Sequence, residues 1–291
     1  MQPQRKGSTA LTDPEPRDPG RLSYKPLPES YKRRFHFTLA APSFIYPDHI
    51  LPNAVMLAPF VDEIELVLFQ SASDQDLPPA AEIRELAEIS KDRGLTYNVH
   101  LPIDVSLTDV DAHSRALAIE HTARAVECAR VLAPSTWTLH LPYTEDFADG
   151  TSVHTWQERA TAAAGQLLER TRIAPRSVSV ETLDFPPEWI EPVVSRLDLA
   201  VCLDIGHLIE FGYDISEAFY RFKDRISIFH LYGDVISGRG HVGLHRLPKA
   251  HKPAVKDILS QFTGTVCLEV FSYEDLKASL DALKRLAGKT R

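Results

Sequence analysis

Apolar residues along this chain gather in short runs, and six of these runs lead into a single polar residue near their ends. The residue before each polar one is apolar, and the residue two before it is mostly small or polar. Neighbouring residues of a strand face opposite sides, so each run predicts a strand with one apolar and one mixed face. The six runs span residues 97–102, 137–142, 177–182, 201–207, 226–232 and 266–271.

Two further strands and a set of helix-length segments complete a pattern of eight strand–helix units. Strands that are apolar outside and mixed inside are typical of a parallel barrel wrapped by helices. An open doubly wound sheet also carries polar residues at its strand ends, but six strands converging on one point favour an α/β fold closed as a (β/α)8 TIM barrel. Strands are predicted at 35–40, 63–69, 96–100, 137–141, 177–181, 200–205, 226–231 and 265–271. Helical segments are predicted at 80–91, 112–132, 156–171, 188–196, 215–222, 254–262 and 273–286.

The chain of 291 residues accommodates one such barrel, which typically needs about 250 residues, together with a short extra segment. Residues 1–33 are rich in proline and charge and have no sustained apolar period. They are predicted to form a flexible N-terminal tail, with the alternative that the stretch from Tyr24 to Tyr31 packs on the barrel. The catalytic barrel domain is predicted to occupy residues 34–291.

Composition narrows the class of protein. The net charge of −8 disfavours a main role in binding nucleic acid, which needs a basic face. Cys128, Cys202 and Cys267 form an odd set, and two of them lie in predicted strands, which indicates reduced thiols of a cytoplasmic protein. The sequence shows neither a membrane-spanning apolar run nor the apolar core of a secretory signal, and it leaves the oligomeric state open.

The polar residues at the strand ends are imidazoles and carboxylates. One histidine at a strand end is more often a core or surface residue than a ligand, so the prediction rests on the repetition across six strands. Mixed nitrogen and oxygen donors suit Zn²⁺, Mn²⁺ or Fe²⁺, and the donors are too many for a single ion. A bridging carboxylate such as Glu181 and two ions roughly 3.5–4 Å apart would suit an in-line attack on a phosphoester. The candidate metal ligands are His100, His140, Glu181, Asp204, His207, His230, His241 and Glu269.

The order of these donors resembles that of the endonuclease IV and xylose isomerase-like barrel superfamily, over nearly all of residues 35–291. The resemblance implies a first metal on His100, His140 and Glu181, and a second on Glu181, Asp204, His230 and Glu269. His207 and His241 match a third set, which also needs an aspartate where this chain has Arg239. The resemblance therefore implies two or three divalent ions, Zn²⁺ or Mn²⁺, and Asp234 is the alternative ligand for the third.

A narrower resemblance involves residues 43–53 (SFIYPDHILPN) and 61–70 (VDEIELVLFQ), together with the motifs DIGH, HLYG and LEVF. These segments are similar to the CbiR family, the cobamide-remodelling phosphodiesterases. The resemblance implies hydrolysis of a phosphoester in the nucleotide loop of a cobamide, a corrinoid of the vitamin B12 class. Phe44 and Tyr46 are then expected to contact the large planar substrate, although residues 43–53 also suit an ordinary loop after the first strand.

Catalytic roles follow from the same interpretation. Glu181 and Glu269 are expected to ligate metal, and one of them to orient or deprotonate the attacking water. Arg239 is expected to contact phosphate oxygens through its planar guanidinium, with a solvated loop cation as the alternative.

Three other functions remain open from the sequence. A xylose isomerase-like sugar isomerase or epimerase would use mainly the Glu181, Asp204, His230 and Glu269 set with one metal. An abasic-site endonuclease is disfavoured by the acidic charge. A non-catalytic protein that binds a cobamide or a metal is the remaining possibility, and turnover with added metal distinguishes it from an enzyme.

Overall fold

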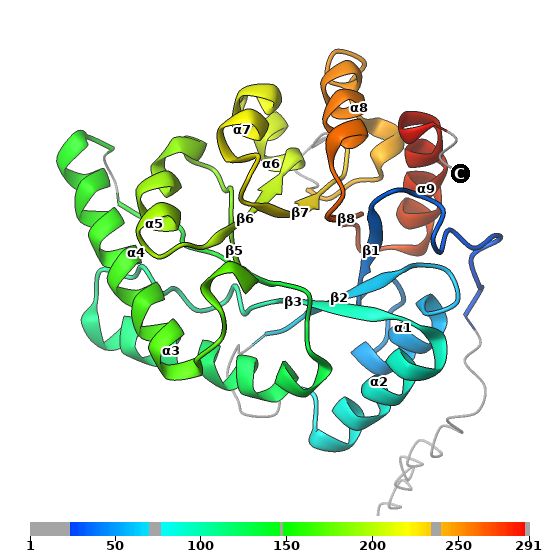
Figure 1. The fold of residues 1–291 in the computed structure, drawn as a ribbon, viewed down its shortest axis with the longest axis horizontal. Helices are drawn as coiled ribbons and strands as arrows, with labels where there is room; N and C mark the ends of the chain where they lie inside the picture. Colours follow the sequence, from blue (N-terminus) through cyan, green and yellow to red (C-terminus); the bar gives the residue numbers. More distant parts are fainter. Residues whose placement is uncertain (1–23, 70–76, 146–147, 234–239, 289–291) are drawn as a thin grey trace, which may run out of the picture.

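The computed structural model describes residues 24–69, 77–145, 148–233 and 240–288. Within them, eight parallel strands pair in chain order and close into one barrel, because β8 also pairs with β1. Figure 1 shows the helices arranged around the outside of these strands. The prediction of a closed (β/α)8 barrel is confirmed, and an open sheet is excluded. The strands are β1 (Thr38–Pro42), β2 (Glu63–Val67), β3 (Thr96–His100), β4 (Trp137–Leu139), β5 (Val178–Glu181), β6 (Ala200–Asp204), β7 (Ile226–His230) and β8 (Thr265–Cys267).

Helices connect the strands along the outside of the barrel. Several begin at an aspartate or serine whose side chain accepts a hydrogen bond from a backbone N–H of the first turn, as Asp111, Asp149, Asp214 and Ser272 do. None of the described helices is long and apolar enough to cross a membrane. The α-helices are α1 (Ile50–Leu57), α2 (Ala80–Arg93), α3 (Ala112–Ala129), α4 (Gly150–Thr171), α5 (Glu191–Arg196), α6 (Ile205–Glu210), α7 (Ile215–Phe222), α8 (Lys252–Gln261) and α9 (Tyr273–Ala287). Short 3₁₀ helices are η1 (Arg130–Leu132), η2 (Pro175–Ser177), η3 (Pro187–Ile190) and η4 (Leu244–Arg246).

The two faces of the strands belong to two separate apolar cores. The predicted outward residues all lie in the large core between barrel and helices; they are Val99, Leu139, Val180, Leu203, Phe229 and Leu268. A second, small core of Ala40, Cys202, Ile228 and Cys267 fills the inside of the barrel. The alternation in the sequence therefore predicted the direction of each side chain correctly. All three cysteines are free thiols, and Cys202 and Cys267 are buried in this inner core.

Some boundaries differ from the prediction for local reasons. Strand β1 begins later than expected, at Thr38, and β8 ends at Cys267 because the chain turns there, with the Val270 N–H donating to the Leu268 carbonyl at 2.9 Å. Helix α4 begins earlier than expected because Asp149 and Ser152 form a capping box. The short helices α1 and α6 were not predicted, and α6 follows Asp204 without an intervening loop.

Residues 24–33 pack on the barrel, although the sequence grouped them with the tail. Leu27 and Tyr31 are only 3% and 2% exposed. The Tyr31 hydroxyl lies 3.3 Å from Asp281 in α9, and the Tyr24 ring stacks on Tyr46 with centroids 5.1 Å apart. The alternative that this stretch packs on the barrel is what the structure shows. Residues 1–23 lie outside the described residues, so the domain boundary at 33/34 stays a prediction.

Replacing Leu27 by alanine is expected to destabilise the protein by about 2–3 kcal/mol, because the side chain is buried and leaves a cavity. Urea unfolding followed by circular dichroism measures the change. Val131→Ala is the matched control, because that side chain is 68% exposed. Equal unfolding midpoints for the two variants would show that the docked segment contributes no stability.

Candidate metal centre

The predicted donors meet at the carboxyl-terminal mouth of the barrel. His100, Glu181, Asp204 and His230 are the last residues of β3, β5, β6 and β7. The remaining members of the six-strand set lie just beyond β4 and β8, and they are His140 and Glu269. Because parallel strands end on one face of a barrel, six segments far apart in sequence deliver their donors to one place.

Glu181 occupies the middle of this cluster. Its Oε2 atom lies 3.1 Å from His100 Nε2 and 3.0 Å from His140 Nε2. Those three residues form one group whose donor atoms lie within 4.8 Å of one another, and Glu181 also belongs to a group with Asp204, His230 and Glu269. The two groups adjoin, because His100 also forms a group with His230 and Glu269. Glu181 therefore belongs to both donor groups, as a carboxylate that serves two cations would.

His230 links the second group to a residue that the sequence analysis missed. Its Nδ1 atom lies 3.1 Å from Glu269 Oε2 and 3.5 Å from Glu181 Oε2, while its Nε2 atom lies 3.2 Å from Glu65 Oε2. A carboxylate behind a ligating imidazole fixes the ring and its tautomer. The signal was present in β2, where EIELV places Glu63 and Glu65 on the inward face between outward Ile and Leu.

Buried polar atoms of the cluster lack hydrogen bonds among the described residues. They include Asp204 Oδ2, His230 Nδ1 and Glu269 Oε2, whose close contacts with one another and with His207 are ion pairs without hydrogen-bond geometry. A buried polar atom without a partner costs about 1–3 kcal/mol, and more when it is charged. A divalent cation at the cluster would satisfy these atoms, and mixed imidazole and carboxylate donors fit Zn²⁺ or Mn²⁺. The residues present therefore fit a metal centre.

The imidazoles have proton affinities set by the neighbouring carboxylates. Burial alone would lower the pKa of His100, but the hydrogen bond to Glu181 and the charges of Glu181 and Glu65 raise it to about 9. Burial also opposes the charge on His207, yet the charges of Asp204 and Glu181 raise its pKa to about 9. Both rings therefore bind a proton at neutral pH when no cation is bound.

The pKa values of two carboxylates in the cluster, Glu181 and Asp204, are shifted in opposite directions. Burial would raise the pKa of Glu181, but the charges of His140 and His230 hold it well below its usual value. For Asp204, burial dominates and raises the pKa to about 7, with help from the charge of Glu181. The cluster thus carries both ionised carboxylates and protonated imidazoles, and a metal ion would replace the protons.

Metal affinity is expected to rise steeply between pH 6.5 and pH 8.5. Imidazoles with a pKa of about 9 hold protons below that pH, and a cation has to displace them. Each displaced proton makes the apparent affinity change by up to about tenfold per pH unit. Competition with a chromophoric chelator, corrected for the chelator's own protonation, measures this slope. An affinity that is flat across the range would contradict the proton displacement.

His207 and His241 lie at the edge of the cluster. Among the described residues, neither belongs to a group of three donors whose atoms all lie within 4.8 Å of one another. His207 Nδ1 lies 3.0 Å from the Thr182 carbonyl, so Nε2 is the ring nitrogen that would bind a ligand. His241 Nε2 lies 3.4 Å from Glu269 Oε2, and the two imidazole rings are 6.3 Å apart. The two histidines are thus close enough to share a ligand, while Arg239 and Asp234 lie outside the described residues.

A buried hydroxyl beside the cluster was also missed from the sequence. Tyr232 is 1% exposed, and its OH has no hydrogen-bond partner among the described residues. Its ring lies 4.5 Å from the ring of His241 and covers Gly206, where an added Cβ would be 2.0 Å from Tyr232 Cζ. Burial, with the charges of Asp204 and others, raises the pKa of this phenol and keeps it a donor. Only a glycine at position 206 leaves room for the ring.

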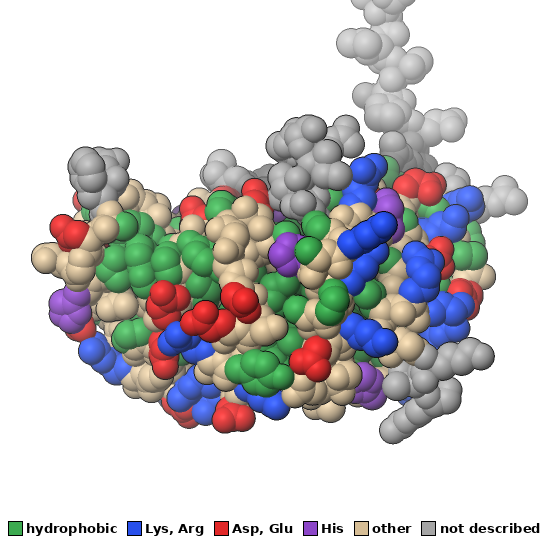
Figure 2. Space-filling model, turned by 90° about the horizontal axis from the view of Figure 1, so that it is seen from above, with side chains coloured by type: hydrophobic (Ala, Val, Ile, Leu, Met, Phe, Trp, Pro, Cys, Tyr) green, Lys and Arg blue, Asp and Glu red, His purple; other side chains and the backbone are tan. Residues whose placement is uncertain are grey.

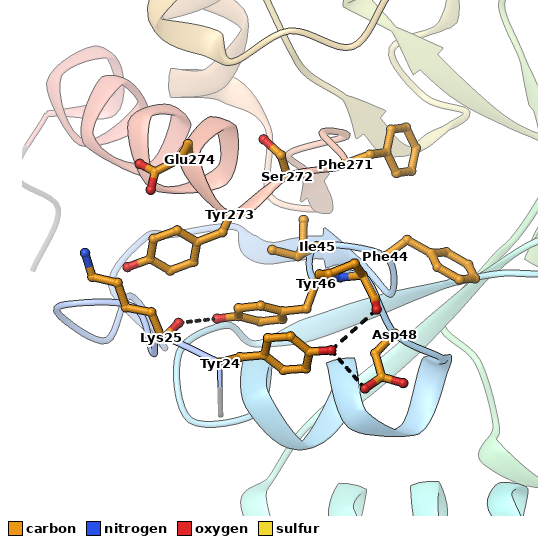
Figure 3. Close-up of a pocket in the computed structure, with 11 residues that line it drawn as sticks. Tyr24, Lys25, Phe44, Ile45, Tyr46, Asp48, Phe271, Ser272, Tyr273 and Glu274 are labelled. Atoms are coloured by element: carbon orange, nitrogen blue, oxygen red, sulfur yellow. Dashed lines mark hydrogen bonds between the residues drawn. The ribbon is translucent and has the colours of Figure 1, made fainter. Parts of the chain in front are cut away.

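Phe44 and Tyr46 line a pocket of about 640 Å³ near the barrel mouth. We call it the aromatic pocket; its aromatic residues are Tyr24, Phe44, Tyr46, Phe271 and Tyr273. Figure 3 shows Phe44 and Phe271 at one end and the three tyrosines together at the other. Tyr46 is 4% exposed and donates from its hydroxyl to the Lys25 carbonyl at 2.9 Å, so it holds the N-terminal segment as well as lining the pocket.

Comparison with known proteins identifies the family of this barrel. The family model described as xylose isomerase-like TIM barrel matches residues 61–287, well over half of the chain. The chain belongs to this family. The matched stretch contains all eight candidate donors, so the candidate metal centre lies in the part of the chain that the family shares. No curated protein matches the chain in sequence.

The solved structures that resemble this chain include both epimerases and endonucleases. A Thermus thermophilus protein soaked with zinc chloride has a TM-score of 0.64 at 21% identity, over 88% of this chain and 100% of the other. Endonuclease IV from the same organism has a TM-score of 0.63 at 15% identity, over 86% of this chain and 98% of the other. D-psicose 3-epimerase with D-tagatose from Clostridium cellulolyticum has a TM-score of 0.62 at 15% identity, over 86% of this chain and 99% of the other. At these identities the structures support the fold and leave the reaction open.

Proposed function

We propose that this xylose isomerase-like barrel is a divalent-metal-dependent phosphodiesterase that hydrolyses a phosphoester in the nucleotide loop of cobamides, for cobamide remodelling. The observation that carries the proposal is the pair of donor groups that share Glu181. An epimerase with one metal needs mainly Glu181, Asp204, His230 and Glu269. The additional group with His100 and His140 suits a second ion. The similarity of residues 43–53 and 61–70 to the CbiR family supports the choice of substrate.

The residues of the cluster would have two roles, binding the cations and activating the attacking water. His100, His140 and Glu181 would hold one cation, and Asp204, His230 and Glu269 the other, with Glu181 between them. Bound divalent cations supply a nucleophilic water near neutral pH and neutralise charge on the phosphate. Glu181 and Glu269 would ligate metal, and one of them would orient that water or take its proton.

The reaction adds water across one P–O ester bond. The water oxygen bonds to phosphorus, the ester oxygen departs as an alcohol, and the proton from water ends on that alcohol. His207 and His241 lie near one another at the open side of the cluster, where they would contact a third ion or the phosphate itself. Arg239 remains the proposed contact for the phosphate oxygens, on the resemblance alone.

Sugar epimerisation is the second candidate, favoured by the epimerases among the solved structures. Metal content separates the two: one tightly bound ion per chain favours an epimerase, and two or more favour phosphoester hydrolysis. An abasic-site endonuclease is less compatible with the surface charge. On the face in Figure 2, described Lys and Arg side chains gather toward the right-hand end, with some Asp and Glu among them, so it is the net charge of −8 that disfavours a nucleic-acid substrate.

Parallel assays test the proposed function. Protein loaded with Mn²⁺ or Zn²⁺ is offered a complete cobamide in one reaction and D-fructose in another, with chelator-treated protein as the control. We expect the cobamide to be cleaved and the ketose to be unchanged. Conversion of the ketose with an intact cobamide would establish the epimerase alternative instead.

Replacing Tyr232 by phenylalanine is expected to lower turnover by roughly tenfold or more. The lost hydroxyl would donate to a charged ligand at the cluster, and such hydrogen bonds contribute about 1.5–3 kcal/mol. Metal content and thermal stability should be unchanged, because the ring over Gly206 is retained. Tyr220→Phe is the matched control, since its hydroxyl lies on the surface beside Asp257. Full activity of Tyr232→Phe would exclude this role.

A further inference from the structure

The aromatic pocket is formed by three segments that are distant in the sequence. Tyr24 and Lys25 come from the docked N-terminal segment, residues 44–48 follow β1, and residues 271–274 follow β8. The Tyr24 hydroxyl donates to Asp48 Oδ2 at 3.1 Å, and the Tyr46 ring lies between Tyr24 and Tyr273. Figure 3 shows these rings lining one side of the cavity. The tyrosine end is therefore fixed by contacts within the protein.

The other end of the pocket leads to the metal centre. Phe271 is 43% exposed, and its ring lies 5.3 Å from that of His241. His241 Nε2 is in turn 3.4 Å from Glu269 Oε2. A group bound against Phe271 would thus lie next to His241, which is itself a candidate metal ligand. This proximity places one end of the pocket beside the candidate metal centre.

The size of the pocket limits what it accepts. Its volume of about 640 Å³ falls in the range of roughly 300–1,000 Å³ that is typical for sites of small ligands. A corrin with its side chains is larger than such ligands, whereas a heteroaromatic base with its ribose is of suitable size. Phe44 and Phe271 present ring faces and edges, and aromatic side chains bind flat bases by stacking.

We propose that the aromatic pocket binds the planar heteroaromatic base of the nucleotide, with Phe271 and Phe44 as its contacts, and so places the adjoining phosphoester at the metal centre. This inference rests on the proposed function and assigns the base, rather than the corrin, to the pocket. Sequence reasoning assigned Phe44 and Tyr46 to the whole planar substrate. The structure places the Phe271 ring against His241 and gives Tyr46 a supporting position.

Binding of a substrate fragment tests the assignment without turnover. Benzimidazole riboside, which has no phosphate to cleave, is titrated into the full-length protein and followed by calorimetry. We expect saturable binding that is at least about tenfold weaker in Phe271→Ala, since stacking on one aromatic ring contributes on that order. Phe211→Ala is the matched control: Phe211 is 42% exposed and its ring is 6.2 Å from that of His207, but it does not line the aromatic pocket.

The outcomes separate this inference from the proposed function. If both variants bind the riboside equally weakly, the inference is overturned even if cobamides are hydrolysed. It is also overturned if the riboside does not bind while a base-free corrinoid does, and Phe271→Ala weakens the binding of that corrinoid. Riboside binding that depends on Phe271 in a protein that leaves cobamides intact would support the pocket and reject the proposed reaction. Circular dichroism of the two variants verifies that both are folded.

Discussion

Replacement of Glu181 by glutamine is expected to lower turnover by on the order of a thousandfold, the upper range for one electrostatic group, and to reduce bound metal. A neutral amide carries no charge to balance two cations. Glu181 lies 3.1 Å from His100 and 3.0 Å from His140, and it belongs to both donor groups. Its loss therefore affects both ions, whereas a terminal ligand serves one. Metal analysis and turnover of the purified variant measure the two effects.

Glu63→Gln is the matched control for that substitution. Glu63 is also a buried carboxylate inside the barrel, but it accepts hydrogen bonds from Asn98 and Thr265, away from the candidate ligands. An amide oxygen can still accept these hydrogen bonds, so metal content should stay near the wild-type value. If Glu181→Gln retains both metal and activity, Glu181 is not a bridging ligand.

Loading the metal-depleted protein with Zn²⁺ or Mn²⁺ is expected to raise the melting temperature by about 10 °C. A ligand that binds only the folded state at about a thousand times its dissociation constant stabilises by roughly 4 kcal/mol. For a barrel of this length, each kcal/mol corresponds to about 2–4 °C. The physical source is the set of buried atoms that lack hydrogen bonds among the described residues, which includes Asp204 Oδ2 and Glu269 Oε2.

Scanning calorimetry with and without chelator measures this shift. Ca²⁺ should produce a smaller effect, because imidazole nitrogen is a poor ligand for it. The Glu181→Gln protein should lose most of the shift, which links the stabilisation to the cluster. If neither Zn²⁺ nor Mn²⁺ changes the melting temperature, the cluster binds neither ion.

The barrel and the central donors could be predicted because both depend on strand periodicity. The alternation of residue types in each strand indicates which side chains face inward, and parallel strands in a barrel end on one face. Glu181 and His230 could therefore be placed together from local sequence alone. Glu65 carries the same signal in the EIELV run of β2, and it escaped notice because no donor motif marks the end of that strand. Its role depends on register with β7 across the barrel, which the sequence does not state.

Other features depend on tertiary contacts without a local pattern. The N-terminal residues Leu27 and Tyr31 are buried in the large core, and Tyr31 contacts Asp281 of α9 and the Phe60 carbonyl, both distant in the sequence. Tyr232 can lie beside the cluster because Gly206, in α6, leaves space for its ring. Phe271 gains importance from its contact with His241. Such pairings become visible only when the closed barrel places the loops next to one another.

The central claim is metal-dependent hydrolysis of a cobamide phosphoester, and mass analysis of one reaction in ¹⁸O-labelled water tests it most directly. Mn²⁺- or Zn²⁺-loaded protein is incubated with a complete cobamide, and the masses of the corrinoid and nucleotide fragments are measured by mass spectrometry. We predict two fragments, with one ¹⁸O atom on the fragment that carries the phosphate, because the water oxygen bonds to phosphorus. An intact cobamide, or cleavage without ¹⁸O on the phosphate, would contradict the account.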